Sequence, residues 1–255
     1  MTTDFGLRDH FVGVMKGVIL GICREAEIID ISHEVQPFSI AQGAFLVAEA
    51  CRFFPPGTIH IVVVDPGVGT ARRPILVQAR DQYFVGPDNG VLAMAYTGVP
   101  HVARHITAQD YFLQPLSRTF HGRDIFAPLA ARLAMGLGPD EVGPEIEDVF
   151  RPAFDAPQRL SRRTWCGTVL HTDHFGNLIT NFHSREFGDL QLLPFELAIG
   201  TEHLDNFALT YAEIQPRSLA LMLGSSGYYD VAANQGSAAK ILGCGPGTPC
   251  ELTVG

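Results

Sequence analysis

Apolar residues recur three or four positions apart in three stretches of the first half of the chain. This spacing is typical of helices that bury one face, and it predicts helices over residues 11–22, 39–51 and 123–135. Ser39 and Gln42 match a capping box, which would open the second helix. Pro128 predicts a kink in the third helix or a late start for it.

Continuous apolar runs alternate with these helices and predict strands. The runs cover residues 27–32, 59–64, 75–79 and 83–86. Strands that alternate with helices are typical of α/β domains, in which most strands are parallel. We therefore expect an N-terminal α/β domain with a largely parallel sheet over residues 1–152.

Short strand-like runs follow one another beyond residue 163, with few helix signals between them. They read TWCGTVL, NLITNF, LQLLPFELAI, FALTYAEI, SLALML and CELTV. This spacing predicts an antiparallel barrel or sandwich, and we expect a smaller β-barrel-like domain over residues 164–255. Residues 153–163 lie in a stretch rich in proline and arginine and are expected to form a linker.

The composition narrows the classes of function. Of 255 residues, 46% are hydrophobic and 18% are charged, which is typical of a globular protein with a sizeable core. The formal net charge of −9 argues against a nucleic-acid partner, because phosphates require a basic surface. We expect no membrane span, because no apolar run is long enough, and no secretory leader precedes the first motif.

Five cysteines are scattered along the chain, and none forms a C-x-x-C pair. The sequence therefore indicates neither a zinc knuckle nor a thioredoxin-type redox motif. Small apolar cysteines in a reduced compartment are the simpler interpretation, so we expect a cytoplasmic protein.

The most informative polar residue is Asp65, which directly follows the apolar run at 59–64. It opens the sequence DPGVGTARR, in which glycines allow the backbone to approach a ligand closely and two arginines follow. Ligand sites of α/β domains lie just beyond the carboxyl ends of the strands, so Asp65 is a candidate catalytic acid. Taken alone, this aspartate is equally compatible with the cap of a turn.

Six polar islands that contain glycine interrupt the apolar elements. They read TDFGLRDH, DPGVGTARR, PDNG, TFHGRD, TDHFGN and GSSGYYD. Each is compatible with a turn when taken singly. Acids and glycines gathered at the ends of rigid elements are, however, the usual components of an active site.

In this order, the islands, together with MKG at 15–17 and FHGRDIFAP at 120–128, closely resemble the S-adenosyl-L-methionine (SAM) hydrolases that form adenosine. This family is also called the SAM hydroxide adenosyltransferases, and it is related to the SAM-dependent fluorinase and chlorinase. The resemblance runs from Thr3 to about Ala239, and FHGRD and DPGVGT are its most specific parts.

The resemblance implies an α/β domain followed by a β-barrel-like domain. It also implies a homotrimer in which SAM binds between the first domain of one subunit and the second domain of its neighbour. SAM is then the substrate, and we expect neither a cofactor nor a metal ion. Family members have an apolar strand ahead of TDFG, where this sequence has only Met1 and Thr2. Either the sequence begins late or the edge of the sheet is shortened, and we then expect Asp4 to be held less firmly than in its relatives.

The family reaction is the attack of water on C5′ of the ribose, with methionine leaving from the sulfonium. The resemblance assigns the handling of the water to Asp65, Arg72 and His121. Halogenating relatives have tyrosine in place of Asp65 and lack the matching Arg and His, so the sequence favours hydrolysis. In this scheme Asp65 orients the water and takes its proton late, Arg72 stabilises hydroxide character, and neutral His121 relays the proton.

The same resemblance implies the substrate-binding residues. Asp4 would bind both ribose hydroxyls, and Phe38 would line the nucleoside pocket. Asp173, with Asn177 in the same island, would pair with the methionine ammonium group. The remaining expectations are the methionine carboxylate on Ser225 and Ser226, and the adenine edge on the backbone of Val231, Ala233 and Asn234.

Other interpretations stay open. His171, Asp173 and His174 suggest a metal-dependent hydrolase, although they form no standard ligand motif. A non-catalytic SAM- or adenosine-binding protein would bind nucleoside without turnover, and a SAM-dependent halide transferase would use halide in place of water. We expect Asp124 to be a structural partner of Arg123 rather than a reactant.

Overall fold

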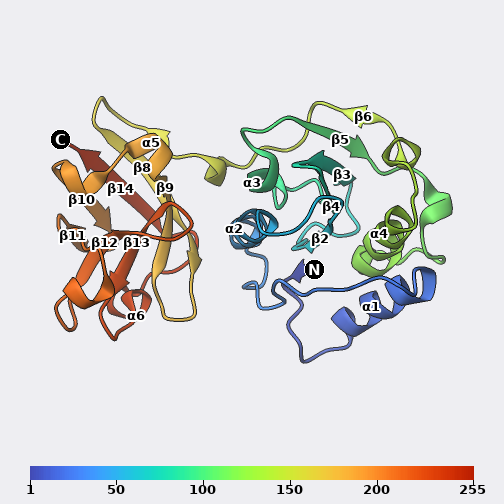
Figure 1. The fold of residues 1–255 in the computed structure, drawn as a ribbon, viewed down its shortest axis with the longest axis horizontal. Coiled ribbons are helices and arrows are strands. Elements are labelled where there is room, and N and C mark those ends of the chain that lie inside the picture. Colours follow the sequence, from blue (N-terminus) through green and yellow to red (C-terminus); the bar gives the residue numbers. More distant parts are fainter. The chain divides into compact units, whose positions relative to one another are not determined.

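The chain divides into two compact units, Met1–Pro152 and Ala153–Gly255 (Figure 1). The computed structural model describes residues 1–255, apart from the side chain of residue 155. Each unit has its own sheet and its own hydrophobic core.

The first unit is built on a six-stranded sheet with the order β1-β2-β4-β3-β5-β6. Its strands are β1 Thr2–Thr3, β2 Ile59–Val63, β3 Pro74–Ala79, β4 Gln82–Pro87, β5 His101–His105 and β6 Glu145–Ile146. Pairs β1–β2 and β2–β4 are parallel and the other pairs are antiparallel, so β3 and β6 run against the other strands. The predicted α/β fold is confirmed, and its sheet is mixed.

A tight hairpin causes the reversal at β3. Arg80 and Asp81 join β3 to β4, and both have positive φ angles, 55° and 57°. Two consecutive residues with positive φ are what a type I′ turn requires, and such a turn fixes two strands as an antiparallel pair. The sheet is therefore mixed, with β1, β2, β4 and β5 running in the same direction, as the alternation of strand and helix patterns predicts for most strands.

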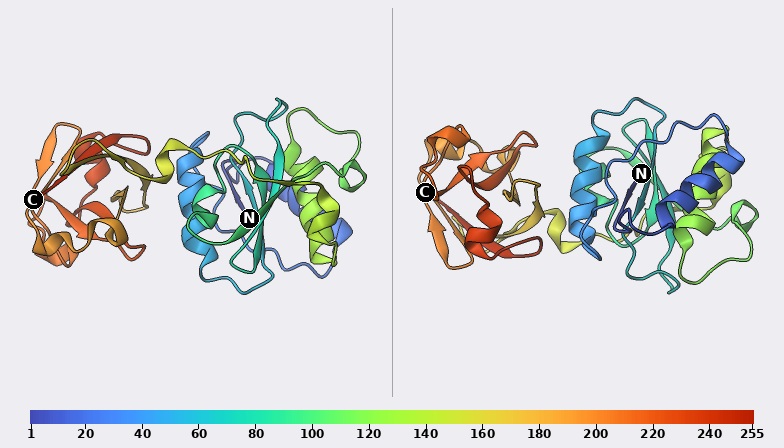
Figure 2. Two further views of the ribbon diagram at one scale, coloured as in Figure 1. Left: turned by 90° about the horizontal axis from the view of Figure 1, so that it is seen from above. Right: turned by 90° about the horizontal axis from the view of Figure 1, so that it is seen from below.

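Helices cover both faces of this sheet (Figure 2). Helices α1 Phe11–Ile22 and α4 Ala127–Ala134 pack together on one face, and α2 Ile40–Cys51 and α3 Ala93–Tyr96 pack together on the other. Successive residues of β2 point to opposite faces, so Val62 and Val63 belong to different cores. The 3₁₀ turns are η1 Gln109–Tyr111 and η3 Pro139–Val142.

The third predicted helix begins in an irregular way. A π-helical turn, η2 Gly122–Phe126, precedes α4, and Pro128 lies at the first turn of that α-helix. Proline is tolerated there because its missing N–H has no intrahelical partner in any case. Of the two alternatives that Pro128 predicts, a kink or a late start, the structure shows the late start of the α-helix.

Two local predictions for the first unit are wrong. Ser39 forms no capping box, because Gln42 Oε1 accepts a hydrogen bond from the Gln36 backbone N–H at 2.7 Å. Residues 27–32 form no strand, because β1 is too short to pair with all of them. Their contact with β1 is limited to one parallel bridge between Ser32 and Thr2 and the hydrogen bonds around it.

The second unit is an antiparallel, nearly closed barrel-like sheet, as predicted. Its order is β11-β10-β14-β8-β9-β13-β12, with β7 beside β8, and β11 approaches β12 where the sheet curls round. The strands are β7 Gln158–Arg159, β8 Thr164–Thr172, β9 Leu178–His183, β10 Phe195–Ile199, β11 Glu202–Leu204, β12 Leu219–Leu223, β13 Tyr228–Ala233 and β14 Pro249–Val254. Short helices are α5 Ser184–Phe187, α6 Ala238–Leu242, η4 Ala153–Asp155, η5 Leu190–Leu192 and η6 Tyr211–Glu213.

The second unit departs from the sequence predictions at three places. Residues 153–163 include η4 and β7, and β7 pairs with β8, so this part of the predicted linker is built into the unit. Residues 207–214 contain η6 and a single bridge from Phe207 to Leu221 instead of a strand. The polar island GSSGYYD includes the first residues of strand β13, which lies between β9 and β12.

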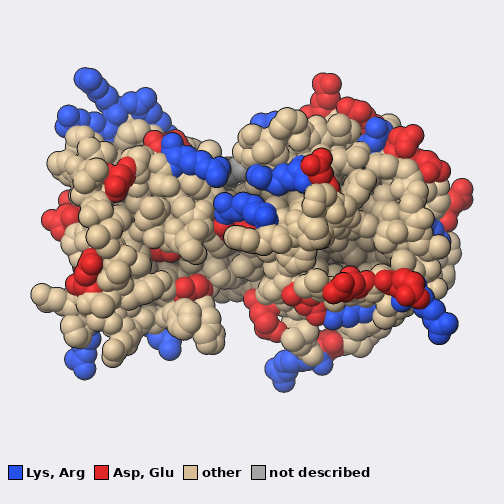
Figure 3. All heavy atoms as spheres, viewed as in Figure 1, with Lys and Arg blue, Asp and Glu red and all other residues tan. Residues whose placement is uncertain are grey.

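Charged side chains of both signs are interspersed over the face drawn in Figure 3. Within the described residues, no helix is long and apolar enough to cross a membrane. The five cysteines are free thiols, and two of them, Cys51 and Cys250, are buried.

Candidate active site

The loop after β2 carries Asp65 out of the sheet. Gly69 in this loop has a φ of 76°, and a Cβ atom on it would lie 2.2 Å from the Arg118 carbonyl oxygen. Only glycine allows both this conformation and this approach. The loop at Asp65 and the segment before His121 are therefore in direct backbone contact.

Arg72 holds Asp65 with a two-pronged ion pair. Its Nε donates to Asp65 Oδ1 at 3.0 Å, and its Nη2 donates to Oδ2. The side chains of Arg72 and Asp65 are only 9% and 4% exposed, so the pair is shielded from solvent. The guanidinium also lies over the ring of Phe126, 5.6 Å from its centroid. Such a planar, bidentate pair fixes the orientation of the carboxylate.

His121 joins this pair through Arg72. It lies just before the π-helical turn η2, and its Nδ1 is 2.8 Å from Arg72 Nη2. A guanidinium can only donate, so Nδ1 accepts and the imidazole is neutral with its proton on Nε2. Burial, and then the positive charge of Arg72, lower the pKa of His121 below its ordinary value, which favours the same neutral form.

One donor of the cluster remains unused. Arg72 Nη1 is buried and has no hydrogen-bond partner among the described residues. A buried donor without a partner is costly unless a ligand or water accepts from it. The structure therefore brings together Asp65, Arg72 and His121, and leaves the Nη1 amino group of the arginine free to donate.

Asp4 and Phe38 lie together in the same unit. Asp4 Oδ2 accepts from the Phe38 backbone N–H at 2.9 Å, and Phe38 has a left-handed φ of 69°. Burial raises the pKa of Asp4 and the charge of Asp65 raises it further, while the Phe38 N–H opposes the shift. The Phe38 ring is 71% exposed, so this aromatic residue is not part of the core.

In the second unit, Asp173 is held by its own island. Asp173 Oδ1 accepts from the backbone N–H groups of Phe175 and Asn177 at 2.9 and 2.8 Å, and Oδ2 accepts from Asn177 Nδ2 at 2.7 Å. Asn177 Nδ2 also lies 3.4 Å from the hydroxyl of Tyr211. Asp173 and Asn177 are thus brought together, and they are joined by Tyr211, for which no motif predicts a role.

The GSSG island is the hairpin loop between β12 and β13. Ser225 is exposed and Ser226 is half-buried, so both remain accessible. A Cβ atom on Gly224 would lie 2.2 Å from Asp230 Oδ2, which places the loop against a carboxylate for which no motif predicts a role. The one signal for Asp230 was an acid within the otherwise apolar run YYDVAA.

Val231 and Ala233 lie in β13. Val231 is 0% exposed, and it pairs with Leu221 on one side and Leu178 on the other. Ala233 is 4% exposed at the end of the strand, and the Asn234 side chain donates to the Ile214 carbonyl at 2.9 Å. The predicted adenine-binding segment is therefore mostly paired with neighbouring strands, and β13 ends only at its C-terminal residues.

Asp124 and the proposed metal ligands are the two remaining candidates, and their contacts do not indicate a reactive site. Asp124 is 0% exposed, pairs with Arg123 at 2.6 Å and accepts from the Ser117 N–H at 2.7 Å, as expected of a structural acid. Among the described residues, no group of three or more His, Cys, Asp or Glu side chains is arranged to hold a metal ion. His171 and Asp173 therefore do not form part of such a group with His174.

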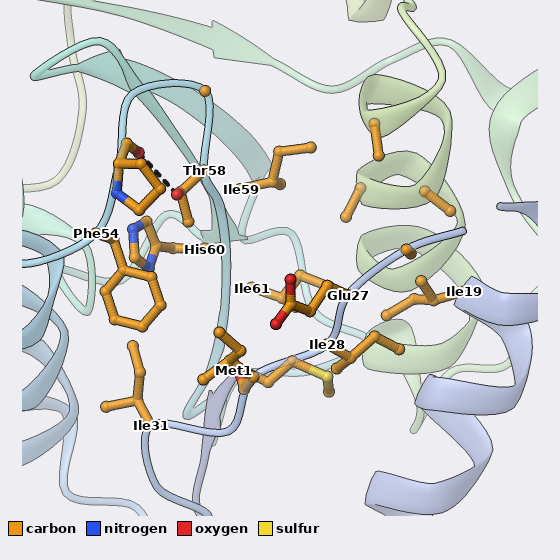
Figure 4. A pocket seen from close by; sticks show the side chains of 17 residues that line it. Met1, Ile19, Glu27, Ile28, Ile31, Phe54, Thr58, Ile59, His60 and Ile61 are labelled. Atoms are coloured by element: carbon orange, nitrogen blue, oxygen red, sulfur yellow. Dashed lines mark hydrogen bonds between the residues drawn. The ribbon is translucent and has the colours of Figure 1, made fainter. Parts of the chain in front are cut away.

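A cavity of about 320 Å³ lies at the opposite end of β2 from Asp65 (Figure 4). Ile59 and Ile61 of β2 line it together with Ile19 of α1 and Met1. Its walls are mainly apolar and include none of the residues that the family resemblance assigns to catalysis or binding.

The fold and the site together define a two-unit α/β protein with an arginine-held aspartate beyond a buried strand. Models of the SAM hydroxide adenosyltransferase N-terminal domain and C-terminal domain match residues 1–143 and 167–251. The chain belongs to the SAM hydroxide adenosyltransferase family, and the resemblance found in the sequence is confirmed.

Two named relatives and one solved structure agree with this membership. A protein of Salinispora tropica named (R)-S-adenosyl-L-methionine hydrolase is 38% identical over 100% of this chain and 97% of its own length. A protein of Nocardia brasiliensis named fluorinase is 26% identical over 99% of this chain and 95% of its own. The crystal structure of an uncharacterized conserved protein from Thermotoga maritima superposes with a TM-score of 0.85, at 36% identity, covering 99% and 98% of the two chains.

Proposed function

We propose that this protein is an enzyme that hydrolyses SAM to adenosine and L-methionine by attack of water on ribose C5′. The observation that carries the proposal is the shielded Asp65–Arg72 pair with His121 on the same guanidinium. Full-length similarity to a named SAM hydrolase at 38% identity supports the substrate.

Asp65 and Arg72 would act on the water. A carboxylate is a far weaker base than hydroxide, so Asp65 cannot make hydroxide in advance. The unused Arg72 Nη1 would donate to the water oxygen, and Asp65 would accept a proton as the C5′–O bond forms. The C5′–S bond breaks with its electron pair going to sulfur, so methionine leaves as a neutral thioether.

His121 would act through Arg72. Its Nδ1 already accepts from Arg72 Nη2, so this lone pair is not available for the proton of the water. We therefore assign His121 to holding the guanidinium in place, a positioning role, in preference to the proton relay that the sequence suggests. A positioned reactant pair can lower a barrier by up to ~7–11 kcal/mol.

Substrate contacts would come from both units. In the first, Asp4 would bind the ribose hydroxyls and Phe38 would line the nucleoside pocket. In the second, Asp173 and Asn177 would bind the ammonium of the methionine part. The methionine carboxylate would lie on Ser225 and Ser226, and adenine at the end of β13 that includes Ala233.

The decisive experiment is incubation of the purified chain with SAM, followed by chromatographic separation of the products. We expect adenosine and methionine in equal amounts, with full activity after exhaustive chelation and no halogenated nucleoside when chloride or bromide is added. Asp65→Ala should keep SAM binding and lose turnover. Binding without turnover by the unmodified protein would instead establish a SAM-binding protein without catalysis.

We also propose a cytoplasmic homotrimer with active sites between neighbouring subunits. The free thiols fit a reduced compartment, and the assembly follows from the family resemblance. Coexpression of Asp65→Ala with Asp173→Ala tests the assembly, because each inactive subunit then supplies the acid that its neighbour lacks. Random mixing should restore about a quarter of the sites. Failure to restore any activity, or a solution mass of one 27.7 kDa chain, would contradict the shared site.

A further inference from the structure

Asp230 is an acid in the interior of a strand. It lies on β13 opposite Met222 of β12 and Ile179 of β9, and it is 8% exposed. Its Oδ1 atom is buried and has no hydrogen-bond partner among the described residues. A buried carboxylate without a donor is energetically costly, so its presence in a folded protein calls for an explanation such as a ligand that binds to it.

Asp124 provides a comparison, because it is a buried acid with a structural role in the same chain. Asp124 is also buried, but Arg123 donates to it at 2.6 Å and the Ser117 N–H at 2.7 Å. Within the described residues, Asp230 has no salt bridge. Its electrostatic neighbour is another acid, Asp173, whose charge works with burial to raise the pKa of Asp230 to about 8.

Asp230 and Asp173 face the same region of the second unit. Asn177, which is bonded to Asp173, directly precedes Leu178, and Leu178 and Ile179 pair with Val231 and Asp230. The backbone of Gly224, next to the two serines of the hairpin loop, lies against Asp230 Oδ2. Asp230 therefore contacts the loop that carries Ser225 and Ser226 and is influenced by the charge of Asp173, and the proposed function assigns the amino-acid part of SAM to these residues.

Asp173 alone is a weak receptor for an ammonium group. A carboxylate has about four acceptor positions, and Asp173 uses three of them for N–H groups of its own loop. An ammonium group has three N–H donors and needs further acceptors. A carboxylate with a free oxygen, close to the first and not paired with any cation of the protein, supplies what is missing.

We propose that Asp230 is a second acid for the α-ammonium group of SAM, and that Asp173 and Asp230 bind this ammonium between them. The inference rests on the proposed function and makes Asp230 a residue that selects for the amino-acid part of the substrate. Binding of the cation replaces the proton on Asp230, so a ligand with the ammonium group releases a proton when it binds and a ligand without it does not.

Few other groups around Asp230 titrate. Asp173 faces it from the loop before β9, and Tyr211 faces both acids from η6, with a pKa raised by burial. His171 on β8 pairs with the same Ile179 as Asp230, and burial lowers its pKa, so it stays neutral above pH 7. The proton released between pH 7 and 8 therefore belongs to Asp230.

Calorimetric titration of the full chain can test this. The probes are S-adenosyl-L-homocysteine, which has the ammonium group, and 5′-deoxy-5′-(3-carboxypropylthio)adenosine, which differs only in lacking it. Titrations at pH 7 in two buffers of different ionisation enthalpy count the protons. The unmodified protein should release close to one proton with the first probe and none with the second.

The variant Asp230→Asn keeps the shape and removes the charge. We expect it to release no proton and, at pH 8.5, to bind S-adenosyl-L-homocysteine about tenfold more weakly, with less than a twofold change for the second probe. Asp205→Asn, at an exposed acid of the same unit, is the matched control and should behave like the unmodified protein.

The outcomes separate the two proposals. If the unmodified protein binds the first probe without releasing a proton, Asp230 does not meet the ammonium group, whether or not the variant folds, and the proposed hydrolase activity still stands. Equal binding of this probe by Asp230→Asn and the unmodified protein at pH 8.5 leads to the same conclusion. If the unmodified protein binds neither probe, both proposals fail.

Discussion

Two buried acids, one in each unit, are held in opposite ways. Asp65 has a cationic partner on both of its oxygens, since Arg72 donates to each of them. Asp230 is buried beside another acid and has an oxygen to which no described group donates. Both acids lie within or next to a buried strand, so burial alone does not explain the contrast.

The difference matches the charge of what each acid is proposed to bind. Water is neutral, and an acid that acts on it must be fixed in place beforehand, which the bidentate arginine pair ensures. An ammonium group brings its own positive charge, and an acid that the protein already neutralised would bind it poorly. The protein supplies a cationic partner to the acid whose reactant is neutral, and it supplies none to the acid whose proposed ligand is cationic.

The substitution Arg72→Lys should have the largest effect, because it disrupts the pair between Asp65 and Arg72. Lysine keeps the positive charge but cannot form the planar pair with Asp65 and also donate to His121. We expect kcat to fall by about 10²–10³-fold with little change in KM for SAM. Steady-state kinetics with SAM measures this effect.

Arg73→Lys is the matched control for that experiment. Arg73 is the next residue, but its partners are Asp88 and Asp148, outside the cluster. A similar fall in kcat for both variants would mean that any arginine in this loop serves a structural purpose. The role of Arg72 in the reaction would then be excluded.

The pH profile should show a smaller effect. Protonation of His121 would remove the lone pair that accepts from Arg72, and the pKa of His121 is lowered, so its neutral form persists to below its ordinary titration range. We expect kcat to be constant above pH 7 and to fall by up to about tenfold per unit only below the ordinary titration range of histidine. His121→Asn, with an oxygen acceptor that does not protonate, should flatten this limb. Asp4 titrates on the acid side as well, but we expect it to change KM.

The smallest effect concerns the stability of the second unit. The pKa of Asp230 in the folded protein, about 8, lies above the value of an unfolded aspartic acid, ~3.9. Stability from this group is therefore fully present below pH ~4 and is lost as pH rises towards 8. Asp230→Asn should raise the melting temperature relative to the unmodified protein by several degrees at pH 8 and by much less at pH 5. A difference that does not depend on pH would argue against a buried, titrating carboxyl.

Local patterns in the sequence were enough to predict the α/β class, the barrel-like second unit and most central elements. The hairpin at Arg80 and Asp81 was not predictable, because the usual signal for two left-handed residues is Asn or Gly. The helix at residue 40 begins without its expected cap, because Gln42 found another partner six residues earlier in the chain. In both cases tertiary contacts overrode a local preference.

The candidate site divides in the same way. Asp65, Arg72 and His121 come from motifs specific enough to be recognised, although their mutual hydrogen bonds depend on chain segments 49 residues apart. Asp230 could not be predicted, because its role depends on the surroundings of Oδ1. Only the structure shows that no group among the described residues donates to this atom. Motifs identify residues, and only the fold shows which buried charges lack a partner.

The close contact between Gly69 and the Arg118 carbonyl constrains how this active site can evolve. It fixes the backbone of two loops against each other, with no room for a side chain between them. A relative can therefore exchange the side chains at positions 65, 72 and 121 without rebuilding the loops that carry them. Diversification of the reaction on this scaffold would then proceed by side-chain replacement, with position 69 unchanged.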